Sequence, residues 1–345
     1  MGGVWASTGG LAWSARGDEV WVAGTREGSD LGLHALGLDG SERELLPAAG
    51  RLVLHDVDAH GRALVERASL HFELPFAAGD GREHNLAWLG MTEPAVLSAD
   101  GHTLLAVETG EAGGPDYTSF VRGTDGSAPV RVGSGRGTDL SPDGRWVAAL
   151  PVRRPDHIEI LPVGAGVPRQ VRFDGIAHYS FAGFHPDGRR LVFAGGPEGH
   201  ASRMYVGALE GGARRAVSPE GVVVDWNTIA PDGRSFVAMC ADSRVCLYSL
   251  DGGAARPIPG TLGQAFQGFA DGARELFVAR SNAFPLAIER VETATGRRRP
   301  WRTLRPADPL GTEGATRVRI TPGGGAYVYA YPRQLSELFV IDGLR

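Results

Sequence analysis

Lysine is absent from this sequence of 345 residues, so all 35 of its basic residues are arginines. The absence excludes a lysine that holds a phosphate group, forms a Schiff base or acts as a general base. Acidic residues number 40, which gives a formal net charge of −5. This balance offers no electrostatic reason to expect a nucleic-acid partner.

Long apolar runs are also lacking. No stretch approaches the roughly 18 apolar residues that cross a bilayer. The first twenty residues carry neither the cationic nor the apolar region of a signal peptide. We therefore expect no membrane insertion and a cytoplasmic location.

Cysteine is scarce, with only two residues in the chain. Cys240 and Cys246 lie on the two arms of a hairpin that turns at residues 241–244. Their proximity across the hairpin makes a disulfide the alternative, but in a chain without an export signal we expect two reduced, half-buried thiols.

Glycine and proline, in contrast, are abundant, with 51 and 22 residues. The segment 138–150, TDLSPDGRWVAAL, shows their use. Pro142 presets its own φ, Gly144 accepts a positive φ, and Trp146 and Val147 favour the strand that follows. The segment therefore predicts a β-hairpin.

This hairpin unit recurs about eight times, and the recurrence predicts the fold. Intervals near forty residues separate the turn glycines of the middle units, which are Gly61, Gly101, Gly144, Gly188, Gly233 and Gly272. A period of about forty residues with four strands is typical of propeller blades, because one blade cannot cover its own apolar faces. We predict an all-β chain that forms a single closed β-propeller domain over residues 1–345, with eight four-stranded blades, or seven as the alternative. An N-terminal strand at about 3–7 is expected to join the last blade, at about 315–345, and close the ring.

The repeats resemble the TolB-type, WD-like propeller repeat, most clearly at Ser141-Pro142-Asp143-Gly144 and in the two units that follow. Segments 10–14, 82–89 and 329–338 further resemble the C-terminal propeller of bacterial serine/threonine protein kinases. That resemblance implies a sensing or signalling module without catalysis of its own. It also implies an extracytoplasmic location if the chain is a fragment of a membrane kinase. The kinase motifs themselves are absent.

The sequence lacks the catalytic motifs of hydrolases and zinc enzymes. The G-x-S-x-G elbow of serine hydrolases is missing, and none of the ten histidines shows the close spacing of a zinc site. We expect no enzyme activity, no metal and no cofactor. The alternative is a hydrolase or lactonase with a metal in the central channel, where histidines distant in sequence could meet.

Two sets of residues are candidates for binding a protein partner or a small ligand, by a chain that we expect to be monomeric. Residues just before the inner strands should converge on one mouth of the channel. These predicted funnel residues are Asp139, His178, Tyr179, Asp225, Trp226, Gln264 and Arg317. The second set is a basic cluster in the link between the third and fourth strands of the seventh unit, where it could dock an acidic or phosphorylated partner or be a solvated loop. Its members are Arg297, Arg298, Arg299, Trp301 and Arg302.

Overall fold

The computed structural model describes residues 4–26, 30–47, 50–79, 81–224 and 228–344. The described residues form strands and two single turns of 3-10 helix, η1 (Glu111–Gly113) and η2 (Pro322–Gly324). The all-β prediction is confirmed. The chain divides into two compact units, of which unit 1 comprises residues 1–71 and 333–345 and unit 2 comprises residues 72–332.

Unit 1 contains the first two hairpin repeats. Its four-stranded antiparallel sheet has the order β1 (Ser7–Trp13), β2 (Glu19–Thr25), β3 (Gly32–Gly37) and β4 (Glu42–Leu46). Strands β5 (Arg51–Val57) and β6 (Ala63–Glu73) pair next to each other, and β6 neighbours the C-terminal part of β29 (Ala326–Ile341). Trp21, Leu33, Leu54 and Val65 form the buried core of this unit.

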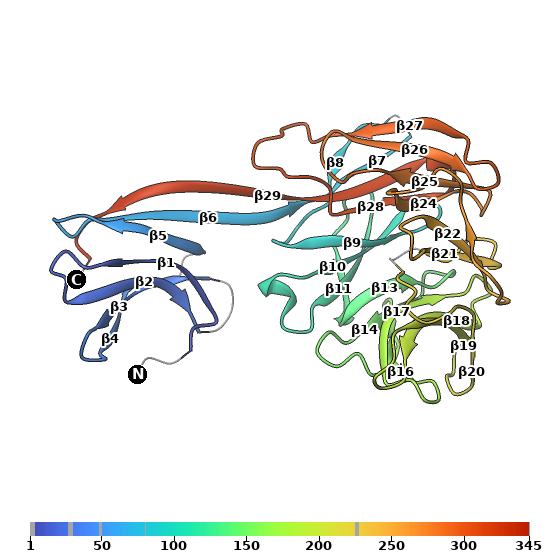
Figure 1. The fold of residues 1–345 in the computed structure, drawn as a ribbon, viewed down its shortest axis with the longest axis horizontal. Helices are drawn as coiled ribbons and strands as arrows, with labels where there is room; N and C mark the ends of the chain where they lie inside the picture. Colours follow the sequence, from blue (N-terminus) through green and yellow to red (C-terminus); the bar gives the residue numbers. More distant parts are fainter. Residues whose placement is uncertain (1–3, 27–29, 48–49, 80, 225–227, 345) are drawn as a thin grey trace. The chain divides into compact units, whose positions relative to one another are not determined.

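Unit 2 contains the regular repeats, each an antiparallel meander (Figure 1). Continuous apolar runs along the central strands, such as residues 147–150 and 104–107, bury both faces of these sheets. Three complete four-stranded sheets come first in the chain. They are β9 (Thr92–Leu97), β10 (Thr103–Glu108), β11 (Thr118–Gly123) and β12 (Val130–Ser134); β13 (Arg136–Leu140), β14 (Trp146–Leu150), β15 (Ile158–Pro162) and β16 (Arg169–Val171); and β17 (His178–Phe184), β18 (Arg190–Gly196), β19 (Arg203–Ala208) and β20 (Arg214–Ala216).

Three further sheets complete unit 2. The fourth has β21 (Ser235–Met239), β22 (Val245–Ser249) and β23 (Arg256–Pro257), with Val223 and Ile229 bridged to β21. The fifth has β24 (Ala265–Asp271), β25 (Glu275–Ala279), β26 (Leu286–Glu292) and β27 (Arg298–Leu304). The last pairs β28 (Arg317–Ile320) and β29 with β7 (Pro75–Ala78) and β8 (His84–Asn85), so the beginning and the end of unit 2 share one sheet.

The first strands of these sheets pack against one another. Strand β9 contacts both β13 and β28, β13 contacts β17, and β24 contacts β28. Side chains reinforce the contacts, because the Thr138 hydroxyl donates to the Ala182 carbonyl at 2.6 Å and Arg319 Nε donates to the Ala95 carbonyl at 2.6 Å. Neighbouring sheets are thus tied near their inner strands without a continuous backbone ladder between them.

The predicted turn geometry is confirmed. Gly61, Gly101, Gly144, Gly188 and Gly233 all have φ between 66° and 80°. At residues 141–144 the Gly144 N–H donates to the Ser141 carbonyl at 2.8 Å. The Ser141 hydroxyl donates to Asp143 Oδ1 at 2.6 Å and accepts from the Trp146 N–H at 2.9 Å. The motif is a turn locked by its own side chains.

The predicted closed ring of eight blades, or seven, is not confirmed. The first two hairpins, at Gly17 and Gly61, belong to unit 1, whereas the sequence counted them as blades of one ring. The predicted pairing of residues 3–7 with 315–345 is also not found among the described residues. The Ala6 N–H donates to the Thr25 carbonyl, and β1 pairs with β2. Strands β7 and β8 stand beside β29 in its sheet instead.

The expectation of two reduced thiols is wrong, because Cys240 and Cys246 form a disulfide with a Cα–Cα distance of 5.8 Å. Ala238 pairs with Cys246 across the hairpin, and Cys240 lies two residues further along the same strand direction. Diagonal neighbours of this kind come within disulfide reach in a twisted hairpin.

Candidate functional site

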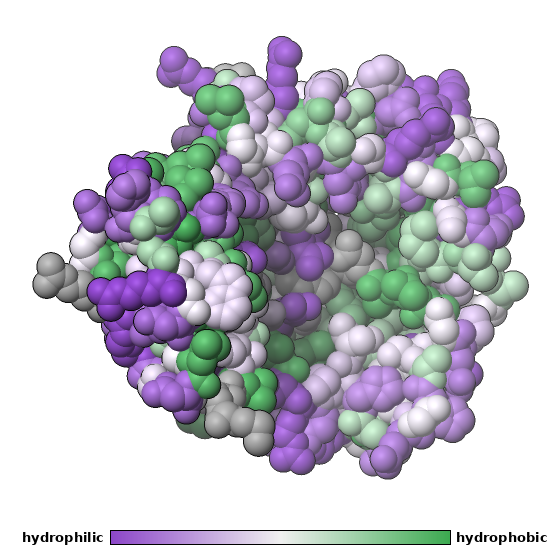
Figure 2. Space-filling view, turned by 60° about the vertical axis from the view of Figure 1, so that its left-hand side comes forward, coloured by the Kyte–Doolittle hydropathy of each residue, from purple (hydrophilic) through white to green (hydrophobic). Residues whose placement is uncertain are grey.

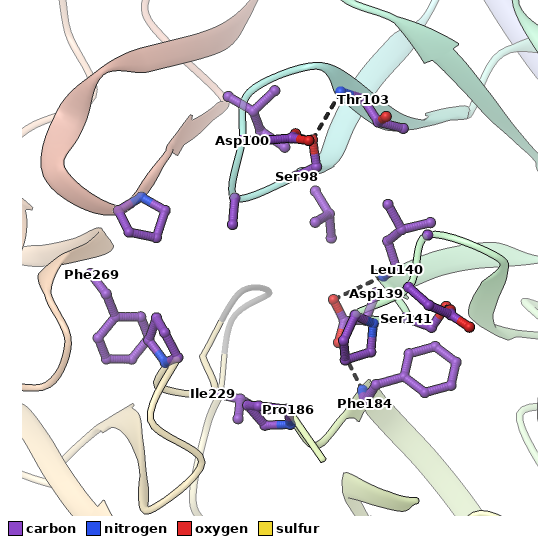
Figure 3. A pocket seen from close by; sticks show the side chains of 18 of the residues that line it. Ser98, Asp100, Thr103, Asp139, Leu140, Ser141, Phe184, Pro186, Ile229 and Phe269 are labelled. Carbon is purple, nitrogen blue, oxygen red and sulfur yellow. Dashed lines mark hydrogen bonds between the residues drawn. The ribbon is translucent and has the colours of Figure 1, made fainter. Parts of the chain in front are cut away.

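A cavity of about 500 Å³ lies where the hairpin turns of unit 2 converge. One apolar residue from each of the six sheets lines it, and all six occupy the same position in the repeat, where the first strand of the sheet leads into its hairpin turn. They are Leu97, Leu140, Phe184, Ile229, Phe269 and Ile320, called here the apolar ring. Figure 3 shows labelled members of the ring facing a common open space. The repeat therefore places equivalent side chains around one axis.

Prolines of the turns extend the apolar lining. In four of the sheets, the residue two positions after the ring residue is a proline that also lines the cavity. These prolines are Pro142, Pro186, Pro231 and Pro322. Because the φ of proline is fixed by its ring, these residues hold the turns in place around the opening. The prolines thus add apolar surface to the turns around the cavity.

The polar groups of the cavity are acidic or neutral. Asp100, Asp139 and Asp143 line it, and among the residues that the structure describes no arginine or histidine does. Hydrogen bonds from the side chains of Ser98 and Ser141, each within its own turn, hold the pKa values of Asp100 and Asp143 below the ordinary value. These two carboxylates are ionised and fixed at the opening.

Asp139 has a different environment. Its Oδ1 accepts from the Leu140 N–H at 2.9 Å, and its Oδ2 accepts from the Phe184 N–H at 2.7 Å, so the carboxyl links β13 to β17 (Figure 3). Protein surrounds the carboxyl group although the residue as a whole is only half-buried. Burial raises the pKa of Asp139 to about 7, against the lowering effect of the two N–H donors. The carboxyl group therefore titrates near neutral pH.

The cavity does not collect the predicted funnel residues. Among those that the structure describes, Asp139 alone lines the cavity. His178 Nε2 lies 3.2 Å from the Ser202 hydroxyl, the buried Tyr179 hydroxyl accepts from the Phe173 N–H, and Arg317 Nε donates to Glu93 at 3.0 Å. Gln264 is buried beside another sheet, and Asp225 and Trp226 lie outside the described residues.

The prediction and the cavity concern opposite ends of the inner strands. The funnel prediction took the residues at the start of each inner strand, whereas the cavity lies at the end of those strands, where the turns begin. The signal that could have found it was the apolar residue that recurs at the end of the inner strand, just before each turn.

The basic cluster is not a loop. Arg298, Arg299, Trp301 and Arg302 lie in strand β27, which pairs with β26. Several of its charges are matched within the fifth sheet. Arg297 lies 3.7 Å from Glu292, Arg298 lies 3.1 Å from Glu289, and Arg299 lies 2.6 Å from Glu275. Pairing in a sheet thus removes much of the charge that the sequence suggested for a partner.

In the part of the chain that the structure describes, no three His, Cys, Asp or Glu side chains are grouped so that they could hold a metal ion. No helix among the described residues is long and apolar enough to cross a membrane.

The surface of the protein mixes hydrophilic and hydrophobic side chains. Figure 2 shows hydrophilic side chains over much of the visible face, with hydrophobic side chains in small groups between them. Single exposed apolar residues such as Val167 and Leu310 are ordinary for a folded protein. The cavity with its apolar ring is therefore the more informative candidate site.

Comparisons with known proteins give similarity in structure only. No protein-family model matches the chain, and no curated protein matches it in sequence. TolB from Acinetobacter baumannii is similar at 13% identity and a TM-score of 0.42, over 70% of this chain and 60% of that chain. A chain of a nidogen/laminin complex is similar at 11% identity and a TM-score of 0.48, over 68% of this chain and 94% of that chain.

A puromycin-hydrolysing peptidase of Mycobacterium tuberculosis is similar at 20% identity and a TM-score of 0.47. The match covers 94% of this chain and 57% of the peptidase chain, so the chain spans little more than half of that protein's length. At these identities and TM-scores the likeness does not extend to what those proteins bind or act on.

Proposed function

We propose that unit 2 is a closed six-bladed β-propeller of the TolB type that binds a protein partner without catalysis, and that the apolar ring is its docking socket. The observation that carries the proposal is the equivalence of the six ring residues, one from each sheet of unit 2. A repeat that returns the same side chain type to one axis builds a symmetric apolar opening, which suits one inserted apolar side chain.

The charges around the ring specify the partner further. Asp100 and Asp143 are ionised at the opening, and no cationic residue from the described part of the chain lines the cavity. A partner segment with an apolar anchor next to a lysine or arginine matches both features. Complementary charge at the rim mainly raises the rate of association, whereas the buried anchor supplies most of the affinity.

A peptide-library selection tests the proposal. The parent protein should enrich peptides that carry a bulky apolar residue beside a basic residue. Ile229→Asp places a charge in the half-buried ring position and should weaken binding of the enriched peptides at least tenfold. Val167→Asp is the matched control, because Val167 is 77% exposed and does not line the cavity.

Peptide binding by the two variants distinguishes the outcomes. Binding that is lost in Ile229→Asp and retained in Val167→Asp supports the socket. Equal binding by both variants would overturn it. Thermal unfolding of both variants shows whether any loss comes from unfolding, and Leu140→Asp repeats the test at a second ring position.

Further proposals concern the relatives of this protein, its chemistry and its compartment. The relation to kinase-associated signalling propellers stays a prediction, and so does the alternative of a channel metal hydrolase, which elemental analysis of the purified protein tests. We also propose that the protein works in an oxidising compartment, because its two cysteines form a disulfide and such bonds persist where thiols are not kept reduced.

A further inference from the structure

A second cavity, of about 560 Å³, lies against the fifth sheet of unit 2. It is separate from the apolar ring, and no residue lines both cavities. Its lining brings together residues from strands β26 and β27, the residue after β25 and the residue before β24. They are Gln264, Arg280, Ala287, Ile288, Glu289, Arg298, Pro300, Trp301, Arg302 and Thr303.

The strand register explains why four of these residues meet. Ala265 pairs with Ala279, and Ala287 pairs with Thr303. Gln264 and Arg280 lie one residue beyond the first pair, and this position continues the row of Ala287 and Thr303. Because side chains of adjacent strands in one row point to the same face, the amide of Gln264 and the guanidinium of Arg280 share a face of the sheet.

Gln264 is the unusual member of the row. Its side chain is 2% exposed, and neither its Oε1 nor its Nε2 has a hydrogen-bond partner in the structure. The nearby Thr261 is also fully buried, but its hydroxyl donates to the Ile258 carbonyl at 2.7 Å. A buried amide without hydrogen-bond partners destabilises the folded state, so it points to a ligand that satisfies both atoms.

Arg280 supplies the charge. It is exposed, and it forms no hydrogen bond or ion pair with any described residue. Arg298, also in the lining, lies 3.1 Å from Glu289, so these two charges balance each other. Arg302 donates to the Tyr327 hydroxyl at 3.1 Å. The cavity therefore has a net positive charge, with Arg280 free to bind an anion.

We propose that this cavity binds the free C-terminal end of a peptide, or a small compound with the same grouping of a carboxylate next to an amide. The planar guanidinium of Arg280 binds the carboxylate in bidentate fashion. The Gln264 amide accepts from the ligand's N–H and donates to its C=O. Inorganic phosphate fits less well, because it lacks the amide group beside the anion whose N–H and C=O would pair with Gln264 together.

Isothermal titration calorimetry of the full chain tests the proposal with three probes. They are N-acetyl-glycyl-alanine with a free carboxylate, the same dipeptide with an amidated C-terminus, and inorganic phosphate. We expect saturable binding of the free dipeptide and binding at least tenfold weaker for the other two. Equal affinity for the free and amidated dipeptides, or no binding of the free dipeptide, would overturn the assignment.

Variants separate binding from a structural role. Arg280→Gln and Gln264→Leu should each weaken binding of the free dipeptide at least tenfold. Arg189→Gln is the matched control, because Arg189 is an exposed arginine in a turn of another sheet. Gln264→Leu removes two unsatisfied polar atoms, so its melting temperature should stay the same or rise. A clear fall in melting temperature with unchanged dipeptide binding would show that Gln264 serves the fold alone.

Discussion

Raising the pH from 5 to 8 should weaken the folded protein through Asp139. Burial raises the pKa of this carboxyl group to about 7, whereas an aspartate in the unfolded chain has a pKa of about 3.9. The folded state therefore holds a proton that the unfolded state has already released. The stability that this proton contributes is fully present below pH 3.9 and is lost as the pH rises through about 7.

The size of the effect follows from the same two pKa values. Between about pH 4 and 7 the free energy of unfolding should fall by about 1.4 kcal/mol for each pH unit. Because Asp139 ionises in the folded state near pH 7, the fall between pH 5 and 8 is about 3 kcal/mol, and it flattens above pH 8.

The carboxyl groups whose pKa is lowered do not change the stability between pH 5 and 8. Burial acts to raise the pKa of Asp187, but hydrogen bonds from the Arg189 N–H and from Arg190 bring it to about 2. A carboxyl group with a lowered pKa contributes stability above about pH 4 and loses it only in acid. Its contribution is therefore constant from pH 5 to 8 and does not mask Asp139.

Urea unfolding at pH 5, 6, 7 and 8 measures the effect, with Asp139→Asn compared with the parent. The asparagine cannot ionise, so its curve should lack the fall of about 3 kcal/mol. One of its two N–H partners, at Leu140 or Phe184, faces the new NH2 group, which lowers stability by about 1–3 kcal/mol at every pH. Asp143→Asn, which removes a carboxyl group with a lowered pKa, should keep the parent's pH profile.

Parallel curves of the free energy of unfolding against pH, for the parent and for Asp139→Asn, would contradict the raised pKa of Asp139. If the parent and Asp139→Asn lose stability equally from pH 5 to 8, Asp139 is ionised throughout that range. Carbon-13 NMR titration of the aspartate carboxyl groups provides a second measurement, in which the signal assigned to Asp139 should move with a midpoint near pH 7.

Two predictions concern the fold. Gly144→Val should destabilise the protein by about 1–3 kcal/mol, since φ is 70° there and nothing lies close enough to clash, so strain is the only cause. Gly325→Val is the control, because φ is −72° and the space is equally open; equal urea midpoints for the two variants would contradict the turn assignment. Reduction of Cys240–Cys246, or Cys246→Ser, should cost about 2 kcal/mol, as a short disulfide loop does in the chain-entropy model. Alkylation and mass spectrometry of protein purified without reductant check the bond, and two reactive thiols would show that it does not form.

Local structure could be predicted from the sequence to a considerable extent. The turn at 141–144 depends on the φ preferences of Pro142 and Gly144. It also depends on the hydrogen bonds that Ser141 donates to Asp143 and that these two side chains accept from the N–H groups of Trp146 and Arg145. All of these are visible in a short window, so the hairpins and the all-β class were predicted correctly. The apolar residue before each turn was equally visible, although its position at the cavity was not recognised.

The sequence by itself determined the hairpin units and their turn chemistry, because these arise from interactions within a few residues. Only the tertiary structure decided which hairpins join unit 2, that Arg299 meets Glu275, and that Asp139 is buried between two inner strands. It also decided that Gln264 and Arg280 stand side by side in one row. Each of these depends on contacts between residues far apart in the chain, and an identical local motif can enter different packing arrangements. The physical reason is that turn formation is governed by local dihedral preferences, whereas burial, charge pairing and cavity shape are set by long-range packing.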